Sequence, residues 1–185
     1  MSEHKNPWTV IDQKEVYKNN WITLTHFDVL NPSGGKGIYG KVHFNNYAIG
    51  VFVLDEHLNT YLVGQYRFTI DKYSWEMPEG GGLLTEDPLE AAKRELEEET
   101  GLRAADWQEL LQMHLSNSVT NEYSIIYLAR GLSQHTPMPE ETEQLAIKKL
   151  PFEEAYKMME DHIITDSMTI AALLKVKVML MEGRL

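Results

Sequence analysis

The sequence predicts an α/β protein in which a mixed β-sheet is sandwiched between α-helices, with a small antiparallel β-subdomain in front of it. Three observations lead to this prediction. Strand patterns lie on both sides of one helix pattern at 88–100, further helix patterns close the chain, and strand patterns separated by turns begin it. We expect residues 1–45 to form the N-terminal subdomain and residues 46–185 to form one larger domain.

The N-terminal subdomain should be a small antiparallel sheet. Residues 8–17, 21–30 and 37–45 read as strands. They are separated by the polar segment 18–20 and by the turn-rich segment 31–36, which contains proline and two glycines. Turns this short favour antiparallel neighbours.

The larger domain should contain further strands before and after the central helix. Residues 48–54 and 60–68 flank a polar connection and are expected to pair as a core hairpin, followed by a short strand through Trp75. The elements expected after the central helix are strands at 108–115, 122–129 and 145–150 and helices at 152–161 and 167–182, the last with Asp166 as its N-cap.

The central helix has clear boundaries and gathers glutamates on one face. Asp87 is a suitable N-cap, and Gly101 provides the expected stop. At about 100° per residue, Glu95, Glu98 and Glu99 fall within one arc beside an apolar arc. The three carboxylates should therefore share a face next to the core.

Clustered carboxylates of this kind favour a bound cation. Like charges three and four residues apart on a helix are destabilising, and a divalent ion would offset the repulsion. Mg²⁺ prefers oxygen ligands and is usually held by a few carboxylates together with substrate phosphates. The alternative interpretation is a solvated acidic face on a surface helix.

Composition excludes several classes of function. The formal net charge is −11, which argues against binding to nucleic acid or to an anionic membrane surface. There are no cysteines, so disulfides, zinc–thiolate sites and thiol nucleophiles are excluded. The N-terminus contains no apolar signal core, and the apolar stretch at 168–181 is short for a membrane span. We expect a cytoplasmic protein.

The segment 80–102, GGGLLTEDPLEAAKRELEEETGL, resembles the complete Nudix box. The matching residues are Gly80, Glu86, Arg94, Glu95, Leu96, Glu98, Glu99, Gly101 and Leu102. The segments GQYRF, WEMPEG, ETEQLAI and ITDSMTIAALL resemble the ADP-ribose and nucleoside diphosphate sugar pyrophosphatase branch of that family. The resemblance implies the α/β/α Nudix fold, with residues 46–185 as the catalytic domain.

The resemblance also implies a metal centre on the central helix. Glu95 and Glu99 would be the principal ligands of Mg²⁺, for which Mn²⁺ could substitute, and Glu98 would be a ligand or a supporting group. The backbone carbonyl of Glu79 would join them. Arg94 would hold the glutamate face in register, and an ion pair of purely structural value is the alternative.

The general base is expected outside the helix, whose own carboxylates would be engaged by metal. Alignment of ETEQLAI with the family places Glu143 at the position of the catalytic glutamate, with Glu141 second and Glu140 third. A solvated acidic loop is the alternative.

Gly80 and Gly81 would allow backbone groups to approach metal and phosphate closely.

Substrate recognition is predicted from four further positions. By the resemblance, Trp21 and Tyr39 would stack on the nucleobase from two different subunits, which implies a homodimer; packing within the small sheet is the alternative. Arg67 matches an arginine that approaches the diphosphate or base. Glu76 matches a position near the substrate, or simply pairs with an arginine.

These features predict metal-dependent hydrolysis of the diphosphate of nucleoside diphosphate sugars. ADP-ribose specialists of the branch usually carry a Ser-Pro-Gly turn where this chain has Ser116-Asn117-Ser118, so we expect a broader range that includes GDP-mannose and UDP-glucose. One alternative is cleavage of dinucleoside polyphosphates, nucleotide caps or coenzyme A. Another is a non-catalytic Nudix module that senses a nucleotide sugar.

Overall fold

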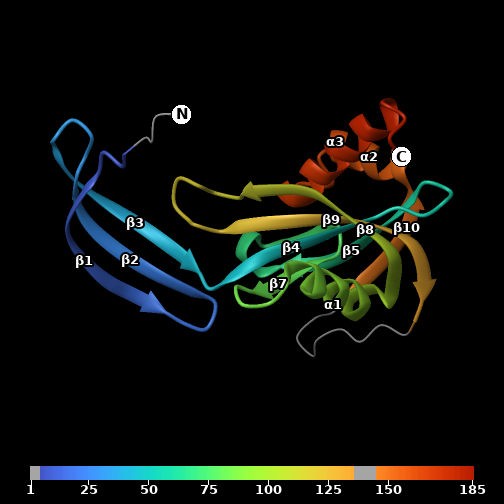
Figure 1. Ribbon diagram of the computed structural model, residues 1–185, viewed down its shortest axis with the longest axis horizontal. Helices are drawn as coiled ribbons and strands as arrows, with labels where there is room; N and C mark the ends of the chain where they lie inside the picture. The colour runs from blue at the N-terminus through green and yellow to red at the C-terminus, as the bar shows by residue number, and fades with distance from the viewer. Residues whose placement is uncertain (1–4, 136–144) are drawn as a thin grey trace. The chain divides into compact units, whose positions relative to one another are not determined.

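The computed structural model describes residues 5–135 and 145–185, which form two compact units (Figure 1). One unit comprises the chain up to Asn46 together with Ser116–Glu122, and the other comprises Tyr47–Leu115 and Tyr123–Leu185. Among the described residues, no helix is both long and apolar enough to cross a membrane.

The first unit is built on a three-stranded antiparallel sheet, as the sequence predicts. Its strands are β1 (Thr9–Lys18), β2 (Ile22–Leu30) and β3 (Lys36–Phe44), in the order β1-β2-β3. Both connections are asparagine-centred turns. The side chain of Asn19 accepts hydrogen bonds from Trp21 N and Ile22 N, and that of Asn31 does the same for Ser33 N and Gly35 N.

The second unit contains two sheets and three helices. A four-stranded sheet has the order β7 (Glu79–Leu83), β4 (Asn46–Val53), β9 (Tyr123–Gln134) and β8 (Leu102–His114). It is mixed, because β4 runs parallel to β9 while β8 is antiparallel to β9. A three-stranded antiparallel sheet has the order β10 (Ala146–Pro151), β5 (Asn59–Arg67) and β6 (Lys72–Glu76). The helices are α1 (Pro88–Thr100), α2 (Phe152–Glu160) and α3 (Ser167–Met181), and a 3₁₀ turn, η1 (Phe68–Ile70), joins β5 to β6.

Helices cover both faces of the mixed sheet, and β4 shows how. Its side chains alternate between the two faces, as those of any strand do. Ile49, Val51 and Val53 are buried with the apolar face of α1, whereas Phe52 is buried in a second cluster that contains residues of α2 and α3. The predicted α/β/α sandwich is confirmed, and Figure 1 shows α1 on one side of the sheet with α2 and α3 on the other.

Two expectations about the strands are corrected. The segments 48–54 and 60–68 do form β4 and β5, but they do not pair as a hairpin, because each joins a different sheet. The glycine-rich segment that follows the short strand β6 is not among the strands that the sequence predicts, yet Glu79–Leu83 is an edge strand, β7. Glycine lacks the β-propensity that identifies strands in a sequence, so the pattern does not reveal β7.

The turn between β4 and β5 is organised by the buried carboxylate of Asp55. Its Oδ1 accepts hydrogen bonds from His57 N at 2.9 Å and Asn59 N at 2.8 Å, and its Oδ2 lies 2.8 Å from Lys149 Nζ of β10. The pKa of Asp55 is strongly lowered: burial acts to raise it, but Lys149 and the amide donors of Asn59 and His57 outweigh burial. This ion pair links the turn to the second sheet.

Replacing Asp55 by asparagine is expected to lower the free energy of unfolding by about 2 kcal/mol near neutral pH, because a hydrogen bond to a charged group contributes about 1.5–3 kcal/mol. The pKa in the folded state is depressed, so this contribution is complete above the unfolded pKa of about 3.9 and is lost as pH falls toward the folded value. Urea unfolding of both proteins across this range should show the difference shrinking below about pH 4. A difference that stays constant with pH would contradict this account.

Candidate active site

The glutamate face of α1 lies beside the core, as its spacing predicts. Asp87 caps the helix by accepting from Leu89 N at 2.9 Å, and Gly101 ends it in a left-handed conformation with φ of 68°. Of the three glutamates, Glu99 is the most enclosed, with 3% of its surface exposed. The side chains of Glu95 and Glu98 are 12% and 33% exposed. Exposure therefore increases across the face from Glu99 through Glu95 to Glu98.

Strand β7 packs so closely against this face that one position requires glycine. A Cβ atom at Gly80 would overlap the carboxylate of Glu95. The neighbouring Gly81 offers its carbonyl oxygen to Arg94, whose Nη2 donates to it at 2.9 Å. The glycines thus bring the backbone of β7 against the carboxylates of α1.

Arg94 ties the glutamates together. Its Nη1 donates to Glu95 Oε1 at 2.7 Å and to Glu98 Oε2 at 3.1 Å, and its Nη2 lies 3.7 Å from Glu86 Oε2. The pKa of Arg94 is raised: burial acts to lower it, but the neighbouring carboxylates of Glu95 and Glu98 outweigh burial. The predicted pair with Glu98 is present, and the guanidinium spans α1 and β7.

Arg67 is held by two carboxylates from the segment that follows it. Its Nε donates to both oxygens of Glu76, at 3.1 and 3.0 Å, and its Nη2 donates to Glu79 Oε1 at 2.8 Å. The pKa of Arg67 is raised, because these charges outweigh the effect of burial. Pairing of Glu76 with an arginine, one of the two readings of the sequence, is therefore observed.

The side chain of Glu79 has a role that sequence reasoning missed. While Oε1 accepts from Arg67, the second oxygen, Oε2, is buried and has no hydrogen-bond partner among the described residues. Burial raises the pKa of Glu79 well above its ordinary value, with help from the charges of Asp166, Glu76 and Glu99 and against the effect of Arg67. Its main-chain N–H donates to Glu99 Oε2 at 2.9 Å, so β7 is bonded directly to α1.

The described residues hold no ready-made metal cluster. Within residues 5–135 and 145–185, no three carboxylate or imidazole side chains are grouped so that they alone could hold an ion. The guanidinium of Arg94 lies against two of the predicted ligands, Glu95 and Glu98. The residues still suit a hard cation, because oxygen donors predominate and a buried carboxylate oxygen of Glu79 lacks a hydrogen-bond partner within residues 5–135 and 145–185.

The acidic loop lies outside the described residues. Glu140, Glu141 and Glu143, which the sequence proposes as the source of the general base, all fall within 136–144.

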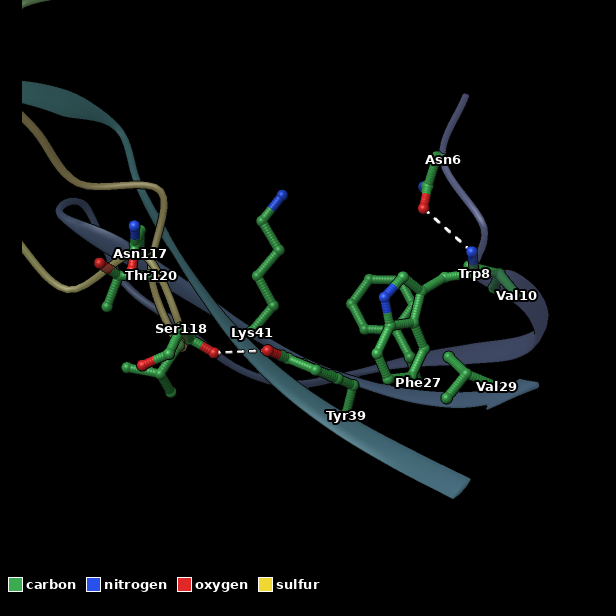
Figure 2. Close-up of a pocket in the computed structure, with 11 residues that line it drawn as sticks. Asn6, Trp8, Val10, Phe27, Val29, Tyr39, Lys41, Asn117, Ser118 and Thr120 are labelled. Atoms are coloured by element: carbon green, nitrogen blue, oxygen red, sulfur yellow. Dashed lines mark hydrogen bonds between the residues drawn. The ribbon is translucent and has the colours of Figure 1, made fainter. Parts of the chain in front are cut away.

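The two aromatic residues predicted to contact the base lie in the first unit. Trp21 is 65% exposed and Tyr39 is 39% exposed. The hydroxyl of Tyr39 donates to Ser118 O at 2.7 Å, and its ring meets Trp8 edge to face at 5.6 Å. Tyr39 lines a pocket of about 430 Å³ in this unit, shown in Figure 2, together with Trp8, Phe27 and Lys41, which the sequence did not single out. Trp21 does not line it.

Comparison with known families decides the identity. The NUDIX domain family model matches residues 45–169, which include the α1 face, β7 and Arg67. The chain belongs to the Nudix family. A second model, for the nucleoside diphosphate sugar hydrolase N-terminal domain, matches residues 8–42, the β1–β3 region of this Nudix protein.

Individual relatives support the same assignment. The Nudix chain is 32% identical over 183 residues to an ADP-ribose pyrophosphatase of Mycobacterium tuberculosis, covering 95% of this chain and 85% of the relative. It is 30% identical to a CMP-5'-(N-acetyl-N-hydroxy-3-aminopropyl)phosphonate hydrolase of Streptomyces rubellomurinus, covering 91% and 82%. A crystal structure of an ADP compounds hydrolase has the same fold, with a TM-score of 0.86 at 22% identity over the whole of both chains.

These matches define the class of enzyme. The protein is a Nudix pyrophosphohydrolase of the nucleoside diphosphate sugar and ADP-ribose pyrophosphatase type. Its Nudix fold, with an N-terminal three-stranded antiparallel sheet, agrees with that assignment. Nudix enzymes typically use a divalent metal ion.

Proposed function

We propose that this Nudix enzyme hydrolyses the diphosphate linkage of several nucleoside diphosphate sugars and releases a nucleoside monophosphate and a sugar phosphate. The observation that carries the proposal is the packing of the α1 glutamate face against β7, with the guanidinium of Arg67 bonded to β7 through Glu79. Carboxylates that could hold a cation thus lie in the same unit as an arginine that could bind an anion.

The residues that would hold Mg²⁺, or Mn²⁺ in its place, are Glu95, Glu98 and Glu99 with the main-chain carbonyl of Glu79. When bound, the metal would neutralise charge on the diphosphate and favour attack by water. Arg94 keeps Glu95 and Glu98 on one face through its two hydrogen bonds. A lysine could not bridge both carboxylates and β7 in the same way, because it lacks the planar fork of arginine.

Arg67 is the proposed diphosphate-binding residue. A guanidinium can donate to two phosphate oxygens at once. Glu76 fixes the orientation of the Arg67 guanidinium by accepting hydrogen bonds from its Nε and its Nη2. The side chain of Arg67 remains 35% exposed, so part of it is accessible to an anionic substrate. Gly80 and Gly81 carry no side chain that would stand between the backbone of β7 and a substrate, so the main chain could approach the phosphates closely.

The proton of the attacking water would go to a loop glutamate. Glu143 is the first choice, and Glu141 is the second. The carboxylates of α1 are less suited, because they would be engaged by metal and are already bonded to Arg94 or to the backbone of β7.

Residues 1–45 are proposed to contribute dimerisation and base binding, with Trp21 and Tyr39 stacking on the base from different subunits. In the described part of the first unit, Val29 is the only buried side chain. Large apolar side chains such as Val10, Ile38 and Trp21 are more than half exposed. Exposed apolar surface of this kind marks a partner surface, here that of a second copy. Sedimentation of a monomer at micromolar concentration would contradict a stable dimer.

Breadth of substrate is supported by two observations. Relatives of nearly equal identity are named for different compounds, ADP-ribose in one case and a CMP-linked phosphonate in the other. Ser116-Asn117-Ser118 also differs from the Ser-Pro-Gly turn of ADP-ribose specialists. The main-chain carbonyl of Ser118 accepts a hydrogen bond from the hydroxyl of Tyr39. Aromatic stacking adds affinity without strong choice among bases.

A substrate panel tests the proposal. The purified protein is incubated with Mg²⁺ and ADP-ribose, GDP-mannose, UDP-glucose, a dinucleoside polyphosphate or coenzyme A, and the products are separated by chromatography. We expect nucleoside monophosphate from more than one nucleotide sugar and no cleavage in excess chelator. Cleavage of only the last two compounds would favour the polyphosphate alternative. Tight binding of a nucleotide sugar without any cleavage would support a sensor and contradict the proposal.

A further inference from the structure

Met77 and Pro78 join β6 to β7 and separate the two carboxylates that hold Arg67. Glu76 ends β6, and Glu79 begins β7. Both accept hydrogen bonds from the Arg67 guanidinium. Any displacement of this linker would therefore move both carboxylates, and the arginine with them.

Side chains from two helices fix the linker through its backbone donors. Pro78 has no N–H, so the segment Met77–Glu79 has only two backbone donors, the N–H groups of Met77 and Glu79. Met77 N donates to Thr169 Oγ1 of α3 at 2.9 Å, and Glu79 N donates to Glu99 Oε2 of α1 at 2.9 Å. Helices α1 and α3 cover opposite faces of the mixed sheet (Figure 1). The two hydrogen bonds therefore hold the linker from both sides.

Thr169 is itself firmly placed. It is fully buried, and its N–H donates to the N-cap Asp166 at 2.7 Å. The next-door Met168 packs with the side chain of Met77 over Gly50 of β4, where an added Cβ would overlap Met77 Cε and lie 2.9 Å from Met168 Cε. The first turn of α3 thus contacts both the backbone and the side chain of Met77.

We propose that Thr169 is a positioning residue for substrate binding. Its hydroxyl accepts the Met77 N–H, fixes the linker between Glu76 and Glu79, and so orients the guanidinium of Arg67. This gives the C-terminal ITDSMTIAALL segment a part in the reaction although it supplies no group to the substrate. The inference rests on the proposed function of Arg67 as the diphosphate ligand.

Thr169→Val keeps the volume of the side chain and removes the acceptor. With ADP-ribose and Mg²⁺ we expect KM to rise about tenfold while kcat changes by less than about threefold, the pattern of a lost binding contact rather than lost chemistry. Thr169→Ser, which retains the hydroxyl, should restore KM. Thr60→Val is the matched control, because Thr60 is also fully buried in the same unit but its hydroxyl has no partner among the described residues. Its KM should be unchanged.

A double-mutant cycle with Arg67→Lys separates positioning from general loss of structure. Each variant is assayed well below its unfolding midpoint, and Thr169→Cys, whose thiol accepts only weakly, replaces the valine variant if that variant does not fold. If Thr169 acts through Arg67, adding Thr169→Val to Arg67→Lys should raise KM much less than it does alone.

Three outcomes would count against the inference. An unchanged KM in Thr169→Val, or an equal rise in both backgrounds, would overturn it and leave the role of Arg67 intact. An unchanged KM in Arg67→Lys and in Arg67→Ala would instead overturn the role of Arg67, and the positioning role with it.

Discussion

Replacing Glu99 by glutamine is expected to lower kcat by about a thousandfold, a loss of about 4 kcal/mol in transition-state stabilisation. Glu99 is the most buried of the α1 glutamates and a proposed metal ligand. Glutamine can still accept the hydrogen bond from Glu79 N, so the contact between α1 and β7 survives while the ligand charge is lost. Steady-state assays over a range of Mg²⁺ concentrations measure the effect.

The same substitution should not destabilise the protein in the absence of metal. Glu99 adds negative charge near the buried carboxylate of Glu79, and removing that charge relieves repulsion between the two. Thermal unfolding in chelator is therefore expected at an equal or higher temperature than for the unchanged protein. Inactive protein that remains fully folded would separate a catalytic loss from misfolding.

Glu97→Gln is the control on the same helix. Glu97 accepts a hydrogen bond from Arg103 at 2.6 Å and is not part of the glutamate face. Its replacement should leave kcat within about twofold, as for a surface residue away from the site. Comparable activity in Glu99→Gln and Glu97→Gln would contradict the assignment of the α1 face as the catalytic centre.

Local signals made much of this fold predictable. Asp87 and Gly101 define α1, Asp166 caps α3, and turns at Asn19 and Asn31 separate β1 to β3, all through contacts between residues close in sequence. Such contacts leave a pattern that one sequence can reveal.

Pairings between distant segments left no such pattern. Strands β4 and β5 are adjacent apolar runs, and nothing in either run indicates that β4 pairs with β9 while β5 pairs with β10. The hydrogen bond from Met77 to Thr169 spans 92 positions. Its partners are an unremarkable backbone amide and a threonine inside a helix, so it becomes visible only in the folded chain.

The candidate site likewise contains residues whose proximity the sequence predicts and residues that only the fold brings together. The box glutamates and Arg94 lie on one helix, so helical spacing alone predicts that they share a face. The carboxylate of Glu79 was missed because its partner, Arg67, comes from another strand. The pocket residues Trp8 and Lys41 were missed because exposed aromatic and basic side chains are common in sheets of this size, and only the fold gathers them beside Tyr39.

Replacing Glu143 by glutamine is expected to lower kcat by about 10²–10⁴-fold, the contribution typical of a general base, with little change in KM or in the Mg²⁺ requirement. Glutamine keeps the size of the side chain and loses the ability to accept a proton. The acidic limb of the dependence of kcat on pH should disappear in this variant. Glu141→Gln should have a smaller effect, and Glu140→Gln the smallest.

The contacts of α1 explain why a loop residue is needed. Glu95 and Glu98 are bonded to Arg94, and Glu99 accepts from the backbone of β7, so each is committed before any proton is transferred. Near-normal turnover in both Glu143→Gln and Glu141→Gln would therefore indicate that the general base is one of the α1 glutamates instead. Glu98 would then be the first candidate, because its side chain is the most exposed of the three and can be released from Arg94 at the smallest cost in buried charge.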